Sequence, residues 1–166
     1  MMQTFRNAKQ INFNTIIYVL IFSLLMSFFG YLYEQIDFIP NYLLANNPKE
    51  ISVYWSKFHY IVNPAHYHIL PATLTVFCLL YIWINRKRLN KLQYKSLILV
   101  TTLIIIVNIL TVIAVFQIND KLYFSKEVNN QINLKWLAIV WSFINIIRLL
   151  ILFICSLEIY NKFKTN

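Results

Sequence analysis

The sequence predicts an all-α protein, an integral membrane antiparallel four-helix bundle that forms a single domain over residues 1–166. Hydrophobic residues make up 59% of the chain and charged residues only 13%, whereas soluble domains carry about 25% charged residues. Four apolar stretches are each long enough to cross a bilayer, which takes about 20 such residues. The connections between these stretches are short enough to favour antiparallel neighbours.

The predicted spans cover residues 13–34, 64–85, 96–116 and 136–157. The first is expected to be an uncleaved helix, because its apolar core is longer than that of a signal peptide and no small-residue cleavage site follows it. The longest predicted loop, 37–63, contains the aromatic segment 52–61. Tryptophan and tyrosine favour the membrane interface, so we expect this segment to lie along the membrane surface, with Trp55 at headgroup depth.

The distribution of lysine and arginine predicts the orientation of the spans. The N-terminal segment, the connector 86–95 and the C-terminal tail hold two, five and two of these residues, and the loops 37–63 and 117–135 hold two and three. Basic residues concentrate on the cytoplasmic side, so both termini are predicted to be cytoplasmic, with the protein in a plasma (inner) membrane. The same preference accounts for the net charge of +9. Membrane lipid is therefore an expected partner and nucleic acid is not, and the sequence leaves the oligomeric state open.

Arg148 is the most informative residue, because it lies inside the fourth span between Lys135 and Glu158. Its guanidinium is always charged, and placing it near the centre of a bilayer costs about 2.5–3.5 kcal/mol on insertion scales. Such a residue must face other protein groups or water, and intramembrane charges commonly mark functional sites. The alternative is that Arg148 only ties helices together through carbonyl groups and asparagine side chains.

Other polar residues are expected near Arg148. Trp141 and Asn145 lie on the same helix face, seven and three residues earlier. One candidate partner is Asn108, in the middle of the third span and at a similar depth. The other is Glu34, at the outer end of the first span, about 15 Å away in depth at 1.5 Å per residue. That pair would need a tilted helix or a water-filled outer vestibule.

The three histidines, His59, His66 and His68, lie around the start of the second span. Helical zinc ligands prefer a spacing of three or four residues, and no histidine occurs in the other spans to complete a haem site, so no metal and no cofactor are predicted. His66 is a candidate acid–base group, and the alternative is an interfacial surface histidine. Cys78 and Cys155 have no metal or redox spacing and are expected to fill the core.

Several short motifs follow one another along the whole chain. They are Tyr33-Glu34 with Pro40-Asn41-Tyr42 at the end of the first span, Asn63-Pro64 at the start of the second, Asn119-Asp120 after the third, and Trp141, Asn145 and Arg148 in the fourth. In order and spacing they resemble the anthrone oxygenase-like family of small four-span membrane proteins, whose function is largely unassigned. The resemblance implies that these residues form the family's pocket. It also implies an activity like that of fungal relatives, the oxidation of polycyclic anthrones to quinones without a known bound cofactor.

Together these observations predict a polar pocket that opens to the outer side of the membrane. Its expected lining is Glu34, Asn63, His66, Asn108, Asn119, Trp141, Asn145 and Arg148. The expected function is the binding, extending to oxidation, of a small apolar or quinone-like molecule from the bilayer. In that reaction Arg148 would stabilise an enolate-like oxygen, and Glu34 or His66 would move protons. The alternative is a non-enzymatic membrane subunit or lipophilic-ligand-binding protein in which the polar residues serve assembly alone.

The predicted topology can be tested with single cysteines in a background that lacks Cys78 and Cys155. A membrane-impermeant thiol reagent added from outside should modify Asn46→Cys and Asn130→Cys, on the predicted outer loops. It should not modify Asn90→Cys, in the predicted cytoplasmic connector. The reverse labelling pattern would contradict the orientation and place the pocket on the cytoplasmic side.

Overall fold

The computed structural model describes residues 12–61, 65–123 and 133–164, and every regular element in these ranges is helical. The longer helices are α1 (Phe13–Leu44), α2 (Pro48–Ile61), α3 (Ala65–Ile84), α4 (Lys91–Ala114) and α6 (Leu134–Phe163). The shorter ones are the 3-10 helix η1 (Arg86–Arg88), the π-helix η2 (Val115–Asn119) and α5 (Asp120–Leu122). The prediction of an all-α protein is confirmed.

Four helical stretches are long and apolar enough to cross a membrane. They are Phe13–Leu44, His66–Ile84, Lys91–Leu122 and Leu134–Phe163. Large apolar side chains such as Phe22, Phe29, Phe77 and Phe116 are each more than 60% exposed on the outside of the molecule. An apolar exterior of this kind suits a lipid solvent, and the prediction of four candidate spans in a membrane protein is confirmed.

The helices of the first and third predicted spans continue beyond the predicted ends. A loop is predicted over 37–63, but α1 continues to Leu44 and α2 fills most of the rest. A proline inside a helix removes one backbone hydrogen bond. Here the burial of Phe38, Ile39 and Tyr42 outweighs that loss. The third span likewise continues through η2 and α5 to Leu122.

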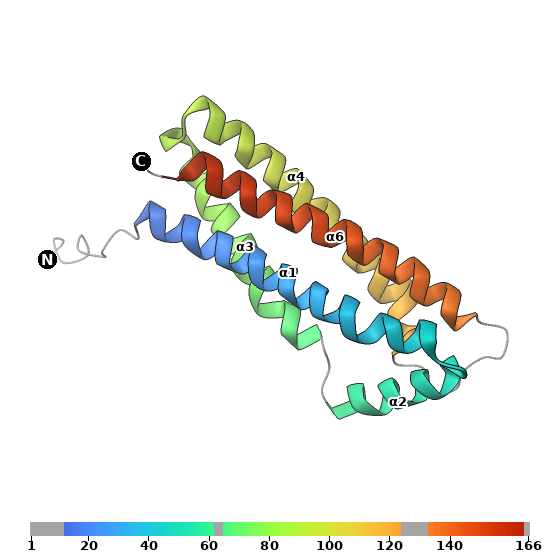
Figure 1. Cartoon of the computed structure of the whole chain (residues 1–166). Helices are drawn as coiled ribbons and strands as arrows, with labels where there is room; N and C mark the ends of the chain where they lie inside the picture. The colour runs from blue at the N-terminus through green and yellow to red at the C-terminus, as the bar shows by residue number, and fades with distance from the viewer. Residues whose placement is uncertain (1–11, 62–64, 124–132, 165–166) are drawn as a thin grey trace, which may run out of the picture.

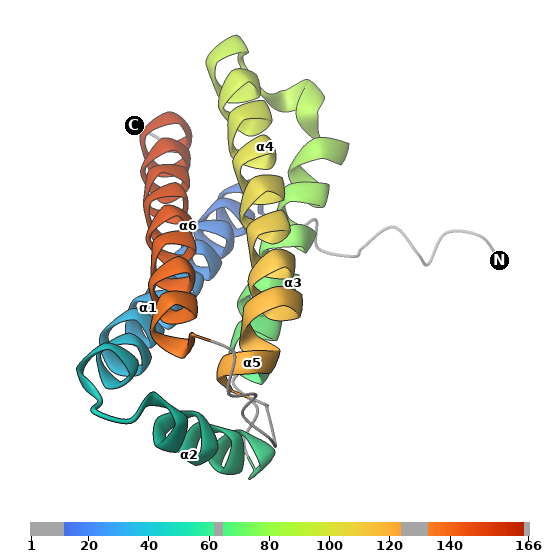
Figure 2. The same cartoon turned by 90° about the vertical axis from the view of Figure 1, so that its right-hand side faces the viewer.

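The long helices form a row in which α1 packs against α3 on one side and α6 on the other, and α6 packs against α4. Figure 1 shows the start of α1 and the end of α6 at the same end of the molecule, so these neighbours run in opposite directions. α3 and α4 contact each other much less. α2 lies across the end of the bundle opposite the α3–α4 connection (Figure 2).

α2 docks onto the ends of α1 and α5 through an aromatic cluster. Trp55 is buried and its ring lies 4.5 Å from that of Phe38. The Ser52 hydroxyl donates to the Leu122 carbonyl at 3.0 Å, and the Tyr42 hydroxyl donates to the same carbonyl. The aromatic residues that predicted an interfacial segment therefore also serve packing inside the protein, and Trp55 faces α1.

His59 makes the docking of α2 sensitive to pH. Its ring is 3% exposed and stacks on Trp55 at 5.5 Å, and this burial lowers the pKa of His59 below its ordinary value. Because the unfolded chain binds the proton more readily, stability that is complete above about pH 6.5 should be lost as the pH falls below that value.

Thermal unfolding in detergent between about pH 8 and about pH 5 measures this dependence. His59→Gln should flatten the curve, whereas His66→Gln, at an exposed histidine, should leave it unchanged. An unaltered curve for His59→Gln would contradict the assignment.

Candidate functional site

Arg148 lies near the middle of α6 and is 3% exposed. Its Nη2 donates to Asn145 Oδ1 at 2.8 Å and its Nη1 to Thr111 Oγ1 at 3.4 Å. Its guanidinium lies 4.1 Å from the centre of the Tyr31 ring and 5.6 Å from that of Trp141. Among the described residues, no carboxylate lies within ion-pair distance of Arg148, and its buried Nε has no acceptor.

Asn145 holds Arg148 in place and fixes the register of two helices. Its Nδ2 donates to the backbone carbonyl of Tyr31 at 2.8 Å and to Gln35 Oε1 at 3.2 Å. Gln35 in turn donates to Ser142 at 2.6 Å. The amide oxygen of Asn145 therefore faces the guanidinium, while its nitrogen anchors α6 to α1.

Thr111 supplies the contact from α4. Its hydroxyl donates to the Val107 carbonyl at 2.8 Å, so its oxygen is left to accept hydrogen bonds. It receives them from Tyr31, at 3.2 Å, and from Arg148. Three helices thus meet at one buried cation.

Neither candidate partner of Arg148 from the sequence forms a hydrogen bond with it in the described structure. Asn108 is exposed and borders a small cavity of about 40 Å³. Glu34 is closer in depth than predicted, because α1 does not end there. The contact of Asn145 with Tyr31 and Gln35 places Glu34 roughly one helical turn, about 6 Å, from Arg148 along the bundle.

Glu34 pairs with His68, whose Nε2 lies 2.8 Å from Glu34 Oε1. The His68 ring stacks on Tyr31 with ring centres 4.6 Å apart. Gly30 makes room for it, since a Cβ at Gly30 would lie 3.0 Å from His68 Cε1. His66, the histidine chosen from the sequence, is exposed. His68 is the histidine that the fold places in the site.

Asn119 and Trp141, two residues of the family-like motifs, are brought together by η2. The Trp141 Nε1 donates to Asn119 Oδ1 at 2.9 Å. The wider turn of a π-helix re-aims side chains and often occurs at functional sites. Asn63 lies outside the described residues.

A cavity of about 540 Å³ joins these groups. Arg148, Trp141, Asn119, Glu34 and His68 all border it. The buried hydroxyl of Tyr123, another lining residue, has no partner among the described residues. Ligand pockets commonly occupy about 300–1,000 Å³, so the space suits a small molecule, and the unpaired polar atoms suit one that carries oxygen.

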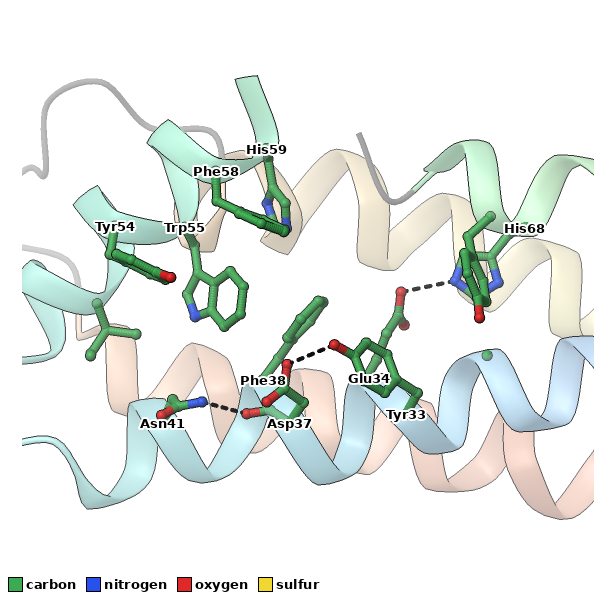
Figure 3. Close-up of a pocket in the computed structure, with 13 residues that line it drawn as sticks. Tyr33, Glu34, Asp37, Phe38, Asn41, Tyr54, Trp55, Phe58, His59 and His68 are labelled. Carbon is green, nitrogen blue, oxygen red and sulfur yellow. Dashed lines mark hydrogen bonds and ion pairs between the residues drawn. The ribbon is translucent and has the colours of Figure 1, made fainter. Parts of the chain in front are cut away.

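A second cavity of about 710 Å³ lies between α1, α2 and the start of α3 (Figure 3). Glu34, Phe38 and His68 border both cavities, so the Glu34–His68 pair and the Phe38 ring form a partition between them. In the described part of the chain, no group of three or more His, Cys, Asp or Glu side chains is placed to hold a metal ion.

Comparisons of the chain with protein-family models, with curated proteins and with solved structures found no match. The fold and the site define the class of the protein, a helical membrane protein with a buried arginine at a ligand-sized cavity. The resemblance to the anthrone oxygenase-like family stays a prediction that rests on the residues that carry it.

Gly30→Ala should disturb the site more than the fold. The new methyl group would push the His68 ring by a few tenths of an ångström, a form of overpacking that costs about 1–3 kcal/mol. Alanine recovers about 1 kcal/mol of helix propensity, so thermal stability should fall only slightly. The His68 imidazole resonances should shift, whereas Ser27→Ala, one turn earlier in α1, should leave them in place. Unchanged His68 resonances in Gly30→Ala would show that the close approach does not position the ring.

Proposed function

We propose that this protein is an antiparallel four-helix bundle of the bacterial inner membrane that binds a small, mainly apolar molecule with a carbonyl or anionic oxygen. The proposed site is the 540 Å³ cavity bordered by Arg148. The environment of the Arg148 guanidinium carries the proposal. The group is buried and borders the cavity, it has no carboxylate partner in the described structure, and its Nε is unpaired. The orientation follows the lysine and arginine counts, with both termini cytoplasmic.

The energetic argument favours a ligand over a purely structural role. A buried cation costs several kcal/mol unless well-placed groups compensate it. The partners of Arg148 are neutral and one of its donors is unmet. A helix-tying residue would be equally served by apolar side chains. A ligand oxygen in the cavity would accept a hydrogen bond from Arg148 Nε and offset part of the positive charge of the guanidinium.

The bilayer is the proposed source of the ligand. α3 and α4 contact each other little, and the cavity reaches their facing residues Ile69, Ala72 and Val115. This edge of the bundle faces lipid in the proposed orientation. An apolar molecule can therefore pass from the hydrocarbon layer between the two helices and place its oxygen at Arg148.

Oxidation of the ligand is a second proposal, favoured by the Glu34–His68 pair at the same cavity. A carbon acid such as an anthrone would lose a proton to this pair. Its enolate oxygen would be stabilised by Arg148. Dioxygen dissolved in the bilayer would then convert the methylene to a carbonyl with release of water. A non-enzymatic subunit or ligand-binding protein is the alternative, and it requires no turnover.

Arg148→Met separates a ligand-binding role from an assembly role. We expect the variant to stay folded with equal or higher thermal stability, because an apolar side chain removes the buried charge. It should lose the binding of anthrone and anthraquinone titrated into the protein in detergent micelles. Arg148→Lys should not restore binding, since an ammonium lacks the planar guanidinium fork. Arg86→Met, at an exposed arginine, is the matched control.

Thr111→Val and Asn145→Leu should each couple to Arg148→Met by about 0.5–3 kcal/mol in double-mutant cycles, as residues in contact do.

Consumption of dioxygen with anthrone, lost in Glu34→Gln, would support oxidation; binding without consumption would support the non-enzymatic alternative. An Arg148→Met variant that unfolds would show an assembly role. One that is stable and still binds would remove Arg148 from the site.

A further inference from the structure

The 710 Å³ cavity under α2 differs from the Arg148 cavity in its aromatic and charged lining. Six aromatic rings line it: Tyr33, Phe38, Tyr54, Trp55, Phe58 and Tyr67. Two carboxylates, Glu34 and Asp37, lie on its α1 side, and its lining residues include neither lysine nor arginine. Figure 3 shows the rings of α2 facing these carboxylates across the space.

Asp37 is the carboxylate whose charge is unmatched. Glu34 is paired with His68 at 2.8 Å. Asp37 Oδ2 accepts a hydrogen bond from the Tyr33 hydroxyl at 3.1 Å, and no ion pair involves Asp37 within the described residues. A partly buried carboxylate among aromatic rings is stabilised by a cation.

The depth of Asp37 places this charge near the outer interface in the proposed orientation. Gln35 of α1 donates a hydrogen bond to Ser142 of α6, so these two residues lie at the same level of the bundle. Asp37 lies two residues closer to the outer end of α1. At 1.5 Å per residue, Asp37 is roughly 8 Å inside the level of Lys135. The headgroup region is roughly 5–7 Å thick on each side of the hydrocarbon core, so Asp37 lies near its inner edge, within reach of the charged group of an amphiphile.

Trp55 provides an independent sign of a ligand. Its side chain is 8% exposed, and its buried Nε1 has no acceptor among the described residues. The residue lines the cavity, and Figure 3 shows its ring nitrogen on the side that faces α1. A ligand that satisfies this donor must carry an acceptor oxygen.

We propose that this cavity binds an organic ammonium ion that carries an oxygen acceptor near its charge. Aromatic faces attract a cation that has shed water, and Asp37 supplies the opposing charge. The Trp55 indole donates to the oxygen. Tyr54 and Phe58, on adjacent turns of α2, present exposed rings to the ammonium group. This site is separate from the Arg148 cavity and selects the opposite charge.

Calorimetric titration of the purified full chain in a non-ionic detergent tests the proposal. The probe is benzoylcholine, which combines a quaternary ammonium with an ester oxygen. Its neutral isostere, 3,3-dimethylbutyl benzoate, has the same shape without the charge. We expect the cation to bind about tenfold or more tightly than the isostere. Equal binding of the two would overturn the proposal.

Asp37→Asn should weaken benzoylcholine binding by about tenfold, whereas Glu50→Gln, at an exposed carboxylate of α2, should not. Tyr54→Leu should weaken binding and Tyr54→Phe should retain it, because the ring face is the proposed contact. Since Tyr54 is 61% exposed, both of these variants should fold even if Asp37→Asn does not. Benzoylcholine binding that survives Tyr54→Leu or a folded Asp37→Asn would contradict the site.

Two competitors distinguish the source of the ligand. Displacement mainly by dodecyltrimethylammonium indicates an amphiphile or lipid headgroup, and displacement mainly by tetramethylammonium indicates a soluble amine. Displacement by neither would show that benzoylcholine binds elsewhere. Arg148→Met should leave benzoylcholine binding intact, so this proposal and the proposed function can fail separately.

Discussion

The buried guanidinium of Arg148 is the constraint on which the rest of the bundle depends. Its charge is met by neutral groups from three helices: Asn145 on α6, Thr111 on α4 and the Tyr31 ring on α1. Asn145 also binds the α1 backbone, so the contact that satisfies the cation sets the register of α1 against α6. A carboxylate at this point would neutralise the charge and close the site. Neutral partners hold the side chain in position and leave its positive charge without a counter-ion among the described residues.

The sequence predicts where the four long apolar helices lie but not how far each helix continues, for a physical reason. Length and apolarity determine whether a segment can cross a membrane, and the four candidate spans are therefore visible in the sequence. Whether a helix continues beyond the apolar stretch depends on packing against other segments. Phe38 and Tyr42 extend α1 past Asp37 because they are buried against Trp55 and Tyr123. The contact between Phe38 and Trp55 depends on where α2 docks. The sequence of α1 alone does not determine that position.

The candidate site likewise has features that the local sequence determines and features that depend on packing between segments. Helical spacing is enough to place Trp141 and Asn145 on the face of Arg148, whereas the pairing of Asn119 with Trp141 depends on the wider turns of η2. His68 was missed because the sequence places His66 and His68 on different faces of a helix without showing which face is buried. It lies seven residues before Thr75, on the buried face of α3, whereas Phe77, eleven residues after His66, is exposed. The depth assigned to Glu34 was wrong because it assumed a helix end at that residue.

Arg148 borders only the first cavity, and Asp37 borders only the second. Glu34 is the carboxylate nearest to the level of Arg148 that could neutralise it, and its engagement with His68 at 2.8 Å directs it elsewhere. His68 can take that position only because the chain's single glycine lets the ring approach α1 closely. Phe38 completes the partition, so that Arg148 borders one cavity and Asp37 the other. The missing Cβ of Gly30 thus positions the His68 ring, and through it the Glu34 carboxylate, at the boundary between the two cavities.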